Sequence, residues 1–313
     1  MRYSFAPLEG LTDSIYRRLH HKYFPGLDRY YMPFLSPTQH RCLTHREERE
    51  LPLAASEDFT AIPQILTKNA QDFLWAAQVC LDRGYEEVNL NLGYPSGTVV
   101  SKGKGSGMLS DPEGLDRFLD TIFESAPLPV SVKTRLGVEN GEEFPKLLEI
   151  YNRYPLAELI VHPRVRKDFY KSPIRMEWFR YATENAKMPL CYNGNLNTLS
   201  DIQSFRAEFP QIDSLMLGRG LIGDPGLLCG AFDGSRVEAF LDELLETYVE
   251  VFGSTRNAMF RMKENWFYLL RRFVPDEKLA KALRKTTDYS EFRAITREIF
   301  RVLPPADSLR ADW

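Results

Sequence analysis

The sequence predicts an α/β fold, a (β/α)8 TIM barrel followed by a smaller C-terminal all-helical domain. Its 313 residues, 43% of them hydrophobic, are enough for one large barrel and an appendage. Short runs typical of β-strands recur about every 25 to 40 residues and alternate with segments of helical periodicity. These strand-like runs stop near residue 235. We therefore expect a barrel domain over residues 1–234 and a helical domain over residues 235–313.

The strand-like runs number eight, which is the number that closes a barrel of this kind. They begin at Tyr3, Arg29, Phe59, Glu86, Pro129, Ala157, Pro189 and Ser214. Helices are predicted between them, for example over residues 70–83 and after the cap signal Asp111-Pro112. Beyond the barrel, residues 237–252 and 257–273 have the periodicity of amphipathic helices.

Composition limits the partners and the location of the protein. A net charge of -3 excludes a polycation built to coat nucleic acid, but 13 Lys and Arg outnumber 8 Asp and Glu from Arg256 onward, so an RNA-binding surface is expected there. The four cysteines are scattered without the spacing of a zinc site or a disulfide scaffold, so we expect reduced thiols and no metal site. The N-terminus does not read as a targeting segment and no apolar run approaches about 18 residues, so we expect a soluble, cytoplasmic protein.

Polar residues within the strand-like runs point to a binding site. Catalytic groups of such barrels lie at the carboxyl ends of the strands. Lys133 and Arg135 share one parity of the fifth run, so both cations are expected to point into the barrel. Because burying cations alone costs free energy, they either face an anionic or electron-rich ligand or pair with an acidic residue of another strand. Four neutral polar side chains end other runs, where they could hold the edge of a flat heteroaromatic ligand: Gln64, Asn91, His162 and Asn193.

Glycine-containing turns follow the last two strand-like runs. Residues 193–195 (NGN) and 218–220 (GRG) offer backbone N–H groups and one guanidinium, at the place where such barrels often bind phosphate. The alternative is that these glycines only make tight turns. The glycines within residues 103–107 form no dinucleotide-binding motif, because no strand-like run directly precedes them, and we expect them to form a mobile lid.

These segments together resemble the tRNA-dihydrouridine synthase (Dus) family, flavin-dependent enzymes that reduce uridine in tRNA. Six segments carry the resemblance in the family's order: FAPLEGLTD (5–13), NLNLGYPSGTVVSKGKGSGML (89–109), SVKTRLG (131–137), HPRVRKDFYK (162–171), NGN (193–195) and LGRGLIGDP (217–225). The resemblance implies that FMN binds at the top of the barrel. The FMN contacts that it implies are Pro7, Leu8 and Glu9 along the isoalloxazine ring, Gln64, Lys133 and His162 at its polar edge, and Asn193, Gly194, Asn195, Gly218 and Arg219 around the ribityl chain and phosphate. It also implies that Asn91, Arg135 and Tyr170 hold the target uracil.

One residue departs from the family pattern. Family members carry a cysteine between the glycine and the proline of the loop after the fourth strand, and use it to protonate the uracil ring, with Lys133 and His162 as the other catalytic residues implied here. This chain has Tyr94 at that position. A phenol, with a pKa of about 10, and a thiol, with a pKa of about 8.5, are both protonated at neutral pH, so either can donate a proton. The phenol reaches further, which requires a displaced loop or another substrate pose. Tyr94 therefore either donates the proton, or packs over the flavin or plugs the uracil site.

The hypothesis is FMN-dependent reduction of uridine to 5,6-dihydrouridine in tRNA by a monomer, with NADPH as the electron donor and the target base turned out of its stack. The alternatives are an inactive relative that binds RNA without turnover and a flavin-dependent reductase of another substrate.

The helical domain contains a run of cations and aromatics suited to RNA. Its members are Arg261, Lys263, Trp266, Tyr268, Arg271, Arg272 and Phe273, followed by four further Lys and Arg residues. Helical spacing, however, predicts that Met262, Trp266, Leu269 and Phe273 form one buried face. The Lys and Arg residues of this run then either contact RNA or form an ordinary solvent-exposed face of the helices.

Overall fold

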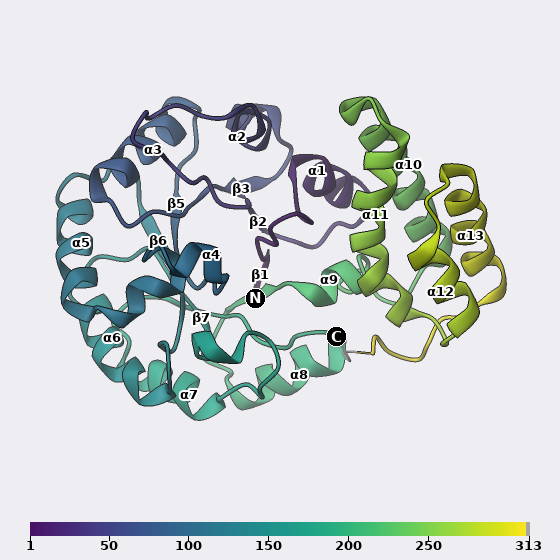
Figure 1. Ribbon diagram of the computed structural model, residues 1–313. Helices are drawn as coiled ribbons and strands as arrows, with labels where there is room; N and C mark the ends of the chain where they lie inside the picture. Colours follow the sequence, from purple (N-terminus) through teal and green to yellow (C-terminus); the bar gives the residue numbers. More distant parts are fainter. Residues whose placement is uncertain (311–313) are drawn as a thin grey trace. The chain divides into compact units, whose positions relative to one another are not determined.

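The computed structural model describes residues 1–310, and the chain divides into two compact units (Figure 1). The barrel unit comprises Met1–Pro7, Asp28–Gly194 and Pro210–Met216, and the helical unit comprises Leu8–Leu27, Asn195–Phe209 and the chain from Leu217 onward. Each unit consists of three separate segments of the chain, whereas the sequence predicts two consecutive domains. The division at residue 234 stays a prediction.

Nine short strands form one sheet within the described residues. They are β1 (Arg2–Phe5), β2 (Arg29–Tyr31), β3 (Thr60–Ile62), β4 (Gln64–Ile65), β5 (Val88–Leu92), β6 (Val130–Arg135), β7 (Leu159–His162), β8 (Leu190–Tyr192) and β9 (Ser214–Leu217). Their order is β3-β2-β1-β9-β8-β7-β6-β5-β4, and the pairings β1–β2, β2–β3 and those from β4 to β9 are parallel.

The barrel closes through Pro63. β3 and β4 stand at the two ends of the strand order, yet Pro63 alone separates them in the chain. Proline has no N–H to donate to a strand ladder, and this interrupts what would otherwise be one strand. Its carbonyl still accepts a hydrogen bond from the N–H of Asn89 (2.8 Å). The eight strand-like runs therefore form the eight strands of a TIM barrel, the third of them split, which confirms the predicted fold.

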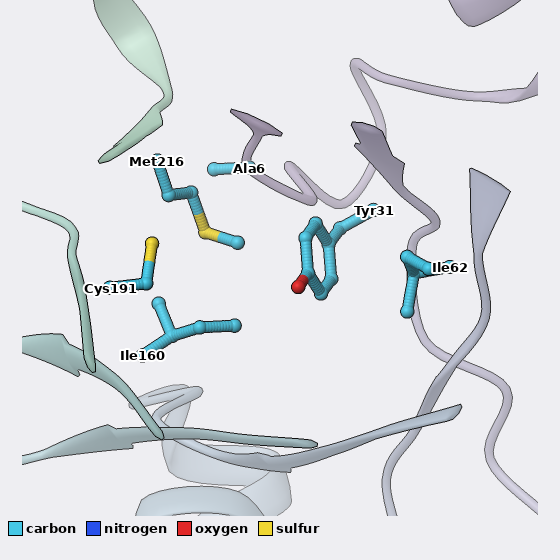
Figure 2. Packing of buried hydrophobic residues seen from close by; sticks show 6 residues of the cluster. All are labelled: Ala6, Tyr31, Ile62, Ile160, Cys191 and Met216. Atoms are coloured by element: carbon cyan, nitrogen blue, oxygen red, sulfur yellow. The ribbon is translucent and has the colours of Figure 1, made fainter. Parts of the chain in front are cut away.

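An apolar layer fills the interior of the barrel (Figure 2). It contains Ala6, Tyr31, Ile62, Ile160, Cys191 and Met216, all buried. Two residues further along three of these strands come Gln64, His162 and Asn193. Because side chains alternate between the two faces of a strand, these polar residues point to the same side as the apolar ones, one step nearer the carboxyl ends. The apolar layer is thus the floor beneath the predicted site.

Four helices of the barrel unit lie outside the strands (Figure 1). They are α3 (Ala70–Asp82), α5 (Pro112–Ser125), α6 (Phe144–Tyr151) and α7 (Met176–Asn185). The shorter helices are α2 (His45–Glu50) and α4 (Gly97–Val100), with 3-10 turns at Ala54–Ser56, Gly105–Ser110, Gly141–Glu143 and Arg166–Asp168. Asn69 caps α3 and Asp111 caps α5, the latter as predicted.

The helical unit contains the remaining helices. They are α1 (Ser14–Tyr23), α8 (Leu199–Glu208), α9 (Arg219–Gly223), α10 (Gly234–Phe252), α11 (Thr255–Leu269), α12 (Glu277–Lys285) and α13 (Tyr289–Val302), with a 3-10 turn at Leu270–Arg272. Gly253 ends α10 in the left-handed region (φ 59°), and Ser254 caps α11. The predicted apolar face of α11 is buried, which confirms it as core. No helix within residues 1–310 is long and apolar enough to span a bilayer.

A buried ion pair holds the end of the helical unit together. Nε of Arg272 donates to Oδ2 of Asp224 (2.9 Å), and both side chains are buried. The guanidinium also donates to the carbonyl of Ala306 and lies 4.5 Å from the ring centroid of Phe232. Arg272 is therefore a structural residue, and the prediction that it belongs to an RNA-binding surface is wrong.

We expect Arg272→Met to lower the free energy of unfolding by about 3–5 kcal/mol, because it leaves the Asp224 carboxylate buried without its partner. The control is Arg301→Met, which breaks an exposed pair with Glu298 and changes that free energy by less than about 1 kcal/mol. Urea unfolding followed by circular dichroism measures both, and equal transition midpoints for the two variants would contradict the expectation.

Candidate active site

A chain of hydrogen-bonded amides lies at the carboxyl ends of β4 and β5. The amide nitrogen of Asn91 donates to Oε1 of Gln64 (2.7 Å), and that of Gln64 donates to Oδ1 of Asn89 (2.8 Å). Asn89 in turn donates to the hydroxyl of Ser131 (3.0 Å). All four side chains are buried, so each fixes the orientation of the next. Sequence reasoning missed Asn89, although it precedes Asn91 by two residues and therefore has the same inward parity.

Lys133 is a partly buried cation on β6, two residues before the fully buried Arg135. Burial, and then the neighbouring Arg135 guanidinium, lower the pKa of the Lys133 ammonium from 10.5 to about 7. Within residues 1–310, neither Lys133 nor Arg135 forms a direct ion pair with a carboxylate, although Asp168, in the loop after β7, attracts the Arg135 guanidinium from further away. The interpretation that they pair with an acidic residue of another strand is therefore wrong. A desolvated ammonium of this kind fits an electron-rich ligand.

Arg135 is bound by the backbone of two loops. Its Nε donates to the carbonyl of Gly93 (2.9 Å), and its Nη1 donates to the carbonyls of Val165 (3.1 Å) and Phe169 (2.9 Å). The ring centroid of Tyr170 lies 5.4 Å from its guanidinium carbon. Burial lowers the pKa of Arg135. The structure thus brings Arg135 and Tyr170 together, as predicted for a shared site.

His162 contacts a second arginine that sequence reasoning did not single out. Nη1 of Arg164 lies 3.0 Å from Nε2 of His162. Because a guanidinium only donates hydrogen bonds, Nε2 must accept, and the imidazole proton is assigned to Nδ1. The rings of His162 and Tyr170 are 5.8 Å apart. Arg164 follows His162 by two residues, and in extended chain this spacing places two side chains on the same side, so it could have predicted the contact.

The backbone of Tyr94 is held on both sides. Oδ1 of Asn91 accepts hydrogen bonds from the N–H groups of Gly93 (3.0 Å) and Tyr94 (2.9 Å). The carbonyl of Tyr94 accepts one from the hydroxyl of Ser106 (2.9 Å). The Tyr94 ring packs edge-on against Phe34, with 5.0 Å between the ring centroids. The loop fixes the position of Tyr94 through its main chain.

The segment expected to be a mobile lid is instead packed. Residues 105–109 are buried and lie within the 3-10 turn Gly105–Ser110. Gly105 has φ 57°, and a Cβ there would lie 2.9 Å from the carbonyl oxygen of Tyr94. A Cβ at Gly107 would lie 3.0 Å from the carbonyl oxygen of Val100. The glycines allow this close packing, so the prediction of a lid is wrong for these residues.

Within the barrel unit, two residues of the predicted phosphate site have well-defined surroundings. The Asn193 side chain donates to the carbonyl of Met216 (2.8 Å). A Cβ at Gly194 would lie 2.0 Å from the Tyr192 hydroxyl, so glycine is required by the neighbouring ring. Pro7, the first residue predicted to contact FMN, ends the N-terminal stretch of this unit.

Within the helical unit, the remaining predicted phosphate residues are also placed. Nη2 of Arg219 donates to Oδ1 of Asn195 (3.3 Å). Gly218 is the N-cap of α9, and a Cβ at Gly220 would lie 2.6 Å from the carbonyl oxygen of Leu196. The loops after β8 and β9 therefore touch. Of the predicted ring contacts, Leu8 donates its N–H to the Thr12 hydroxyl (2.9 Å), and Glu9 lines a cavity of this unit.

That cavity, of about 720 Å³, lies mainly against α11 and α12. Phe260 and Phe267 on its wall are 41% and 49% exposed. The ammonium of Lys263 lies 5.3 Å from the Phe260 ring centroid, and the guanidinium of Arg271 lies 4.4 Å from that of Phe267. We call Phe260, Lys263, Phe267 and Arg271 the α11 stripe. Sequence reasoning found its cations but missed its two phenylalanines, which are seven residues, or about two helical turns, apart.

We expect Gly105→Ala to lower the free energy of unfolding by about 1–3 kcal/mol, because the new Cβ meets the Tyr94 carbonyl at a positive φ. Gly97→Ala in the same loop is the control: its Cβ meets no atom within 4 Å, and alanine favours helix α4. Thermal unfolding of both variants measures the difference. Similar transition temperatures of the two variants would contradict the close packing of Gly105 against the Tyr94 carbonyl.

We expect the stability of the cofactor-free protein to depend on pH through Lys133. Because the folded-state pKa is about 7 and the ordinary value is 10.5, the unfolded state binds more protons between these values. The free energy of unfolding therefore rises with pH there, by at most about 1.4 kcal/mol per pH unit. Lys133→Met removes this contribution, so the variant is more stable than the wild type at pH 7 and the gap closes towards pH 10. A gap that is constant with pH contradicts the lowered pKa of Lys133.

Comparison with known proteins supplies the family. Residues 4–301 match the family model for dihydrouridine synthase (Dus). A tRNA-dihydrouridine(16) synthase from Pseudomonas syringae pv. tomato is 29% identical over 307 residues, which cover 92% of this chain and 96% of that protein. A tRNA-dihydrouridine synthase B from Pasteurella multocida is 26% identical over 229 residues, covering 72% of this chain and 67% of that protein.

A solved structure of morphinone reductase shares the fold. Its TM-score is 0.51 at 13% identity, over 75% of this chain and 88% of that one. The family match extends over nearly all of the residues that carry the polar site, the Tyr94 loop and the helical unit. This chain therefore belongs to the dihydrouridine synthase family.

Proposed function

We propose that this member of the family reduces uridine in tRNA to 5,6-dihydrouridine with bound FMN, and that Tyr94 is the proton donor. The partly buried ammonium of Lys133, whose pKa is lowered and which forms no ion pair with a carboxylate within residues 1–310, carries the proposal. It lies at the carboxyl ends of the barrel strands, where barrel enzymes place their chemistry. A tRNA substrate would place the activity in the cytoplasm.

The residues present fit a flavin. Lys133 offers a positive charge to the electron-rich edge of the ring, and Gln64 is fixed beside it by Asn89 and Asn91. His162 is oriented by Arg164, whose Nη1 lies 3.0 Å from its Nε2, and its ring is proposed at the polar edge of the flavin. Pro7, Leu8 and Glu9 are proposed along the ring. Asn193, Gly194, Asn195, Gly218 and Arg219 are proposed around the ribityl chain and phosphate.

The reaction adds a hydride and a proton across the double bond of the uracil ring. Bound FMN, once reduced by a nicotinamide for which we propose NADPH, would be the source of the hydride for one carbon. The other carbon takes a proton, which we assign to the Tyr94 hydroxyl. Lys133 stabilises negative charge that develops on the uracil carbonyls, because a partly desolvated cation interacts more strongly with charge than a cation in bulk water. Tyr170, which is half exposed, is proposed to lie against the uracil.

The α11 stripe is proposed to contact the tRNA. Exposed aromatic rings stack with unpaired bases, and cations contact phosphates. On the barrel unit, three lysines form a second basic group beside the Tyr94 loop: Lys68, Lys102 and Lys104. Burial, and then Lys102, lower the pKa of Lys104, whose ammonium also donates to the Ser36 hydroxyl (3.3 Å). An RNA phosphate would relieve this repulsion.

The test of the function uses the purified protein, its visible spectrum, and dihydrouridine in tRNA read at every position. We expect a flavin spectrum and NADPH-dependent formation of dihydrouridine. Tyr94→Phe, which removes one hydroxyl and keeps the ring against Phe34, should lower kcat by about 100- to 10,000-fold. Tyr94→Cys should retain activity, because a thiol is also a proton donor.

The other interpretations give different results. A colourless protein that leaves tRNA unchanged contradicts the proposal. If Tyr94 plugs the uracil site, the wild type binds tRNA without turnover, and Tyr94→Cys gains activity. If the substrate is another enone, turnover proceeds without tRNA.

We expect Arg271→Glu to weaken tRNA binding and to lower the slope of log K against log salt by about 1, because one phosphate contact is lost. Phe267→Ala should cost about 1–3 kcal/mol of binding with little change in that slope. The control is Arg301→Glu, which makes the same charge change on the exposed face of α13. Equal effects of Arg271→Glu and Arg301→Glu would show only a dependence on net charge.

A further inference from the structure

We infer that Arg135 is a positioning residue that joins the proton-donor loop to the loop carrying Tyr170, so that the two loops open and close as one unit. This inference rests on the proposed function of Tyr94 and adds a role that direct contact with the uracil does not require. Three of its hydrogen bonds go to main-chain carbonyls, and these belong to loops after two different strands, β5 and β7. The Tyr170 side chain of the second loop also hydrogen-bonds to the guanidinium.

The first loop is held at one peptide group. The carbonyl of Gly93 accepts from Nε of Arg135 (2.9 Å), and the N–H of the same peptide, that of Tyr94, donates to Asn91 (2.9 Å). Two side chains from neighbouring strands therefore hold the two ends of the Gly93–Tyr94 peptide. A peptide fixed at both its oxygen and its nitrogen cannot rotate without breaking one of these bonds. The direction in which the Tyr94 side chain leaves the backbone is set in this way.

The second loop is held at an unusual conformation. Phe169 has φ 49° and ψ -102°, a backbone region that costs a non-glycine residue free energy. Its carbonyl accepts from Nη1 of Arg135 (2.9 Å), and the Val165 carbonyl accepts from the same nitrogen (3.1 Å). Phe169 directly precedes Tyr170, whose ring lies against the guanidinium. Arg135 therefore stabilises the turn that presents Tyr170.

Only an arginine can make this joint. The guanidinium is planar and carries five N–H donors in a fixed arrangement, so Nε and Nη1 can address carbonyls in different directions. A lysine has one nitrogen on a flexible stem and cannot reach both loops with the same geometry. Arg135 is 1% exposed, so water does not replace a lost donor. Each carbonyl left without its donor is a buried group without a hydrogen bond.

The test is hydrogen exchange of the flavin-loaded protein without tRNA. In Arg135→Gln, amides of residues 93–94 and of residues 165–171 should both exchange at least about tenfold faster than in the wild type. Arg135→Lys should do the same although it keeps the charge. The control is Arg166→Gln, in the second loop, whose guanidinium is 3.8 Å from Glu139 at the surface; it should leave residues 93–94 unchanged. Unchanged exchange of either loop in both Arg135 variants overturns the inference.

Kinetics separate positioning from general loss of structure. Arg135→Gln should lower kcat about 10- to 100-fold at saturating tRNA, because the donor is misplaced, with a small change in the KM for tRNA. A raised KM with unchanged kcat overturns the inference. Exchange is measured without substrate, so it tests the joint even if the protein reduces something other than uridine. A chain that lacks the activity but shows both loops opening refutes the proposed function alone.

A measurement on the wild type keeps the inference testable if the variants do not fold. Two loops joined by one side chain form a single cooperative unit. Residues 93–94 and 165–171 should therefore share one opening free energy and one dependence on denaturant. Different values for the two segments overturn the inference.

Discussion

The desolvated ammonium of Lys133 is the constraint around which the barrel interior is arranged. A partly buried cation without a carboxylate partner costs the protein stability, and the lowered pKa of Lys133 expresses that cost. A carboxylate in contact with it would stabilise the empty barrel, and it would also occupy the place of an electron-rich ligand. The neighbouring strands instead supply neutral side chains, Gln64, Asn91 and His162, and Arg135 is satisfied by carbonyls. The free energy of unfolding is lower without a ligand, and an electron-rich ligand beside the Lys133 ammonium would raise it.

Strand geometry makes this arrangement possible. Alternation places an apolar layer one step below the polar one, so that the polar side chains rest on a dry, close-packed floor (Figure 2). Hydrogen bonds between Asn91, Gln64 and Asn89 then link two strands within the polar layer. Because the packed floor and the amide chain are rigid, the loops above them can be positioned by few contacts. The alternation of side chains along the strands thus places a fixed set of hydrogen-bond donors at one level of the barrel.

Much of this could be predicted from the sequence, because strand period and turn residues are local properties. The eight strand-like runs became the barrel, and the inward parity of Lys133 and Arg135 was correct. What escaped prediction depends on contacts between distant segments. The packing of residues 105–109 against Tyr94 and the pairing of Arg272 with Asp224 are examples, as is the use of Arg135 by two loops. A single sequence shows which side chains point inward, but not which backbone carbonyls will meet them.

The path of the loop at position 94 does not depend on the side chain that stands there. Its path is set by Asn91, Arg135 and Ser106, all of which bind main-chain atoms of Gly93 or Tyr94. None of these bonds depends on the identity of the side chain at position 94. Another side chain at position 94 would therefore leave the turn intact, and the Phe34 ring limits the space for it. The main-chain hydrogen bonds of Gly93 and Tyr94 thus form a turn whose geometry is independent of the side chain that it presents.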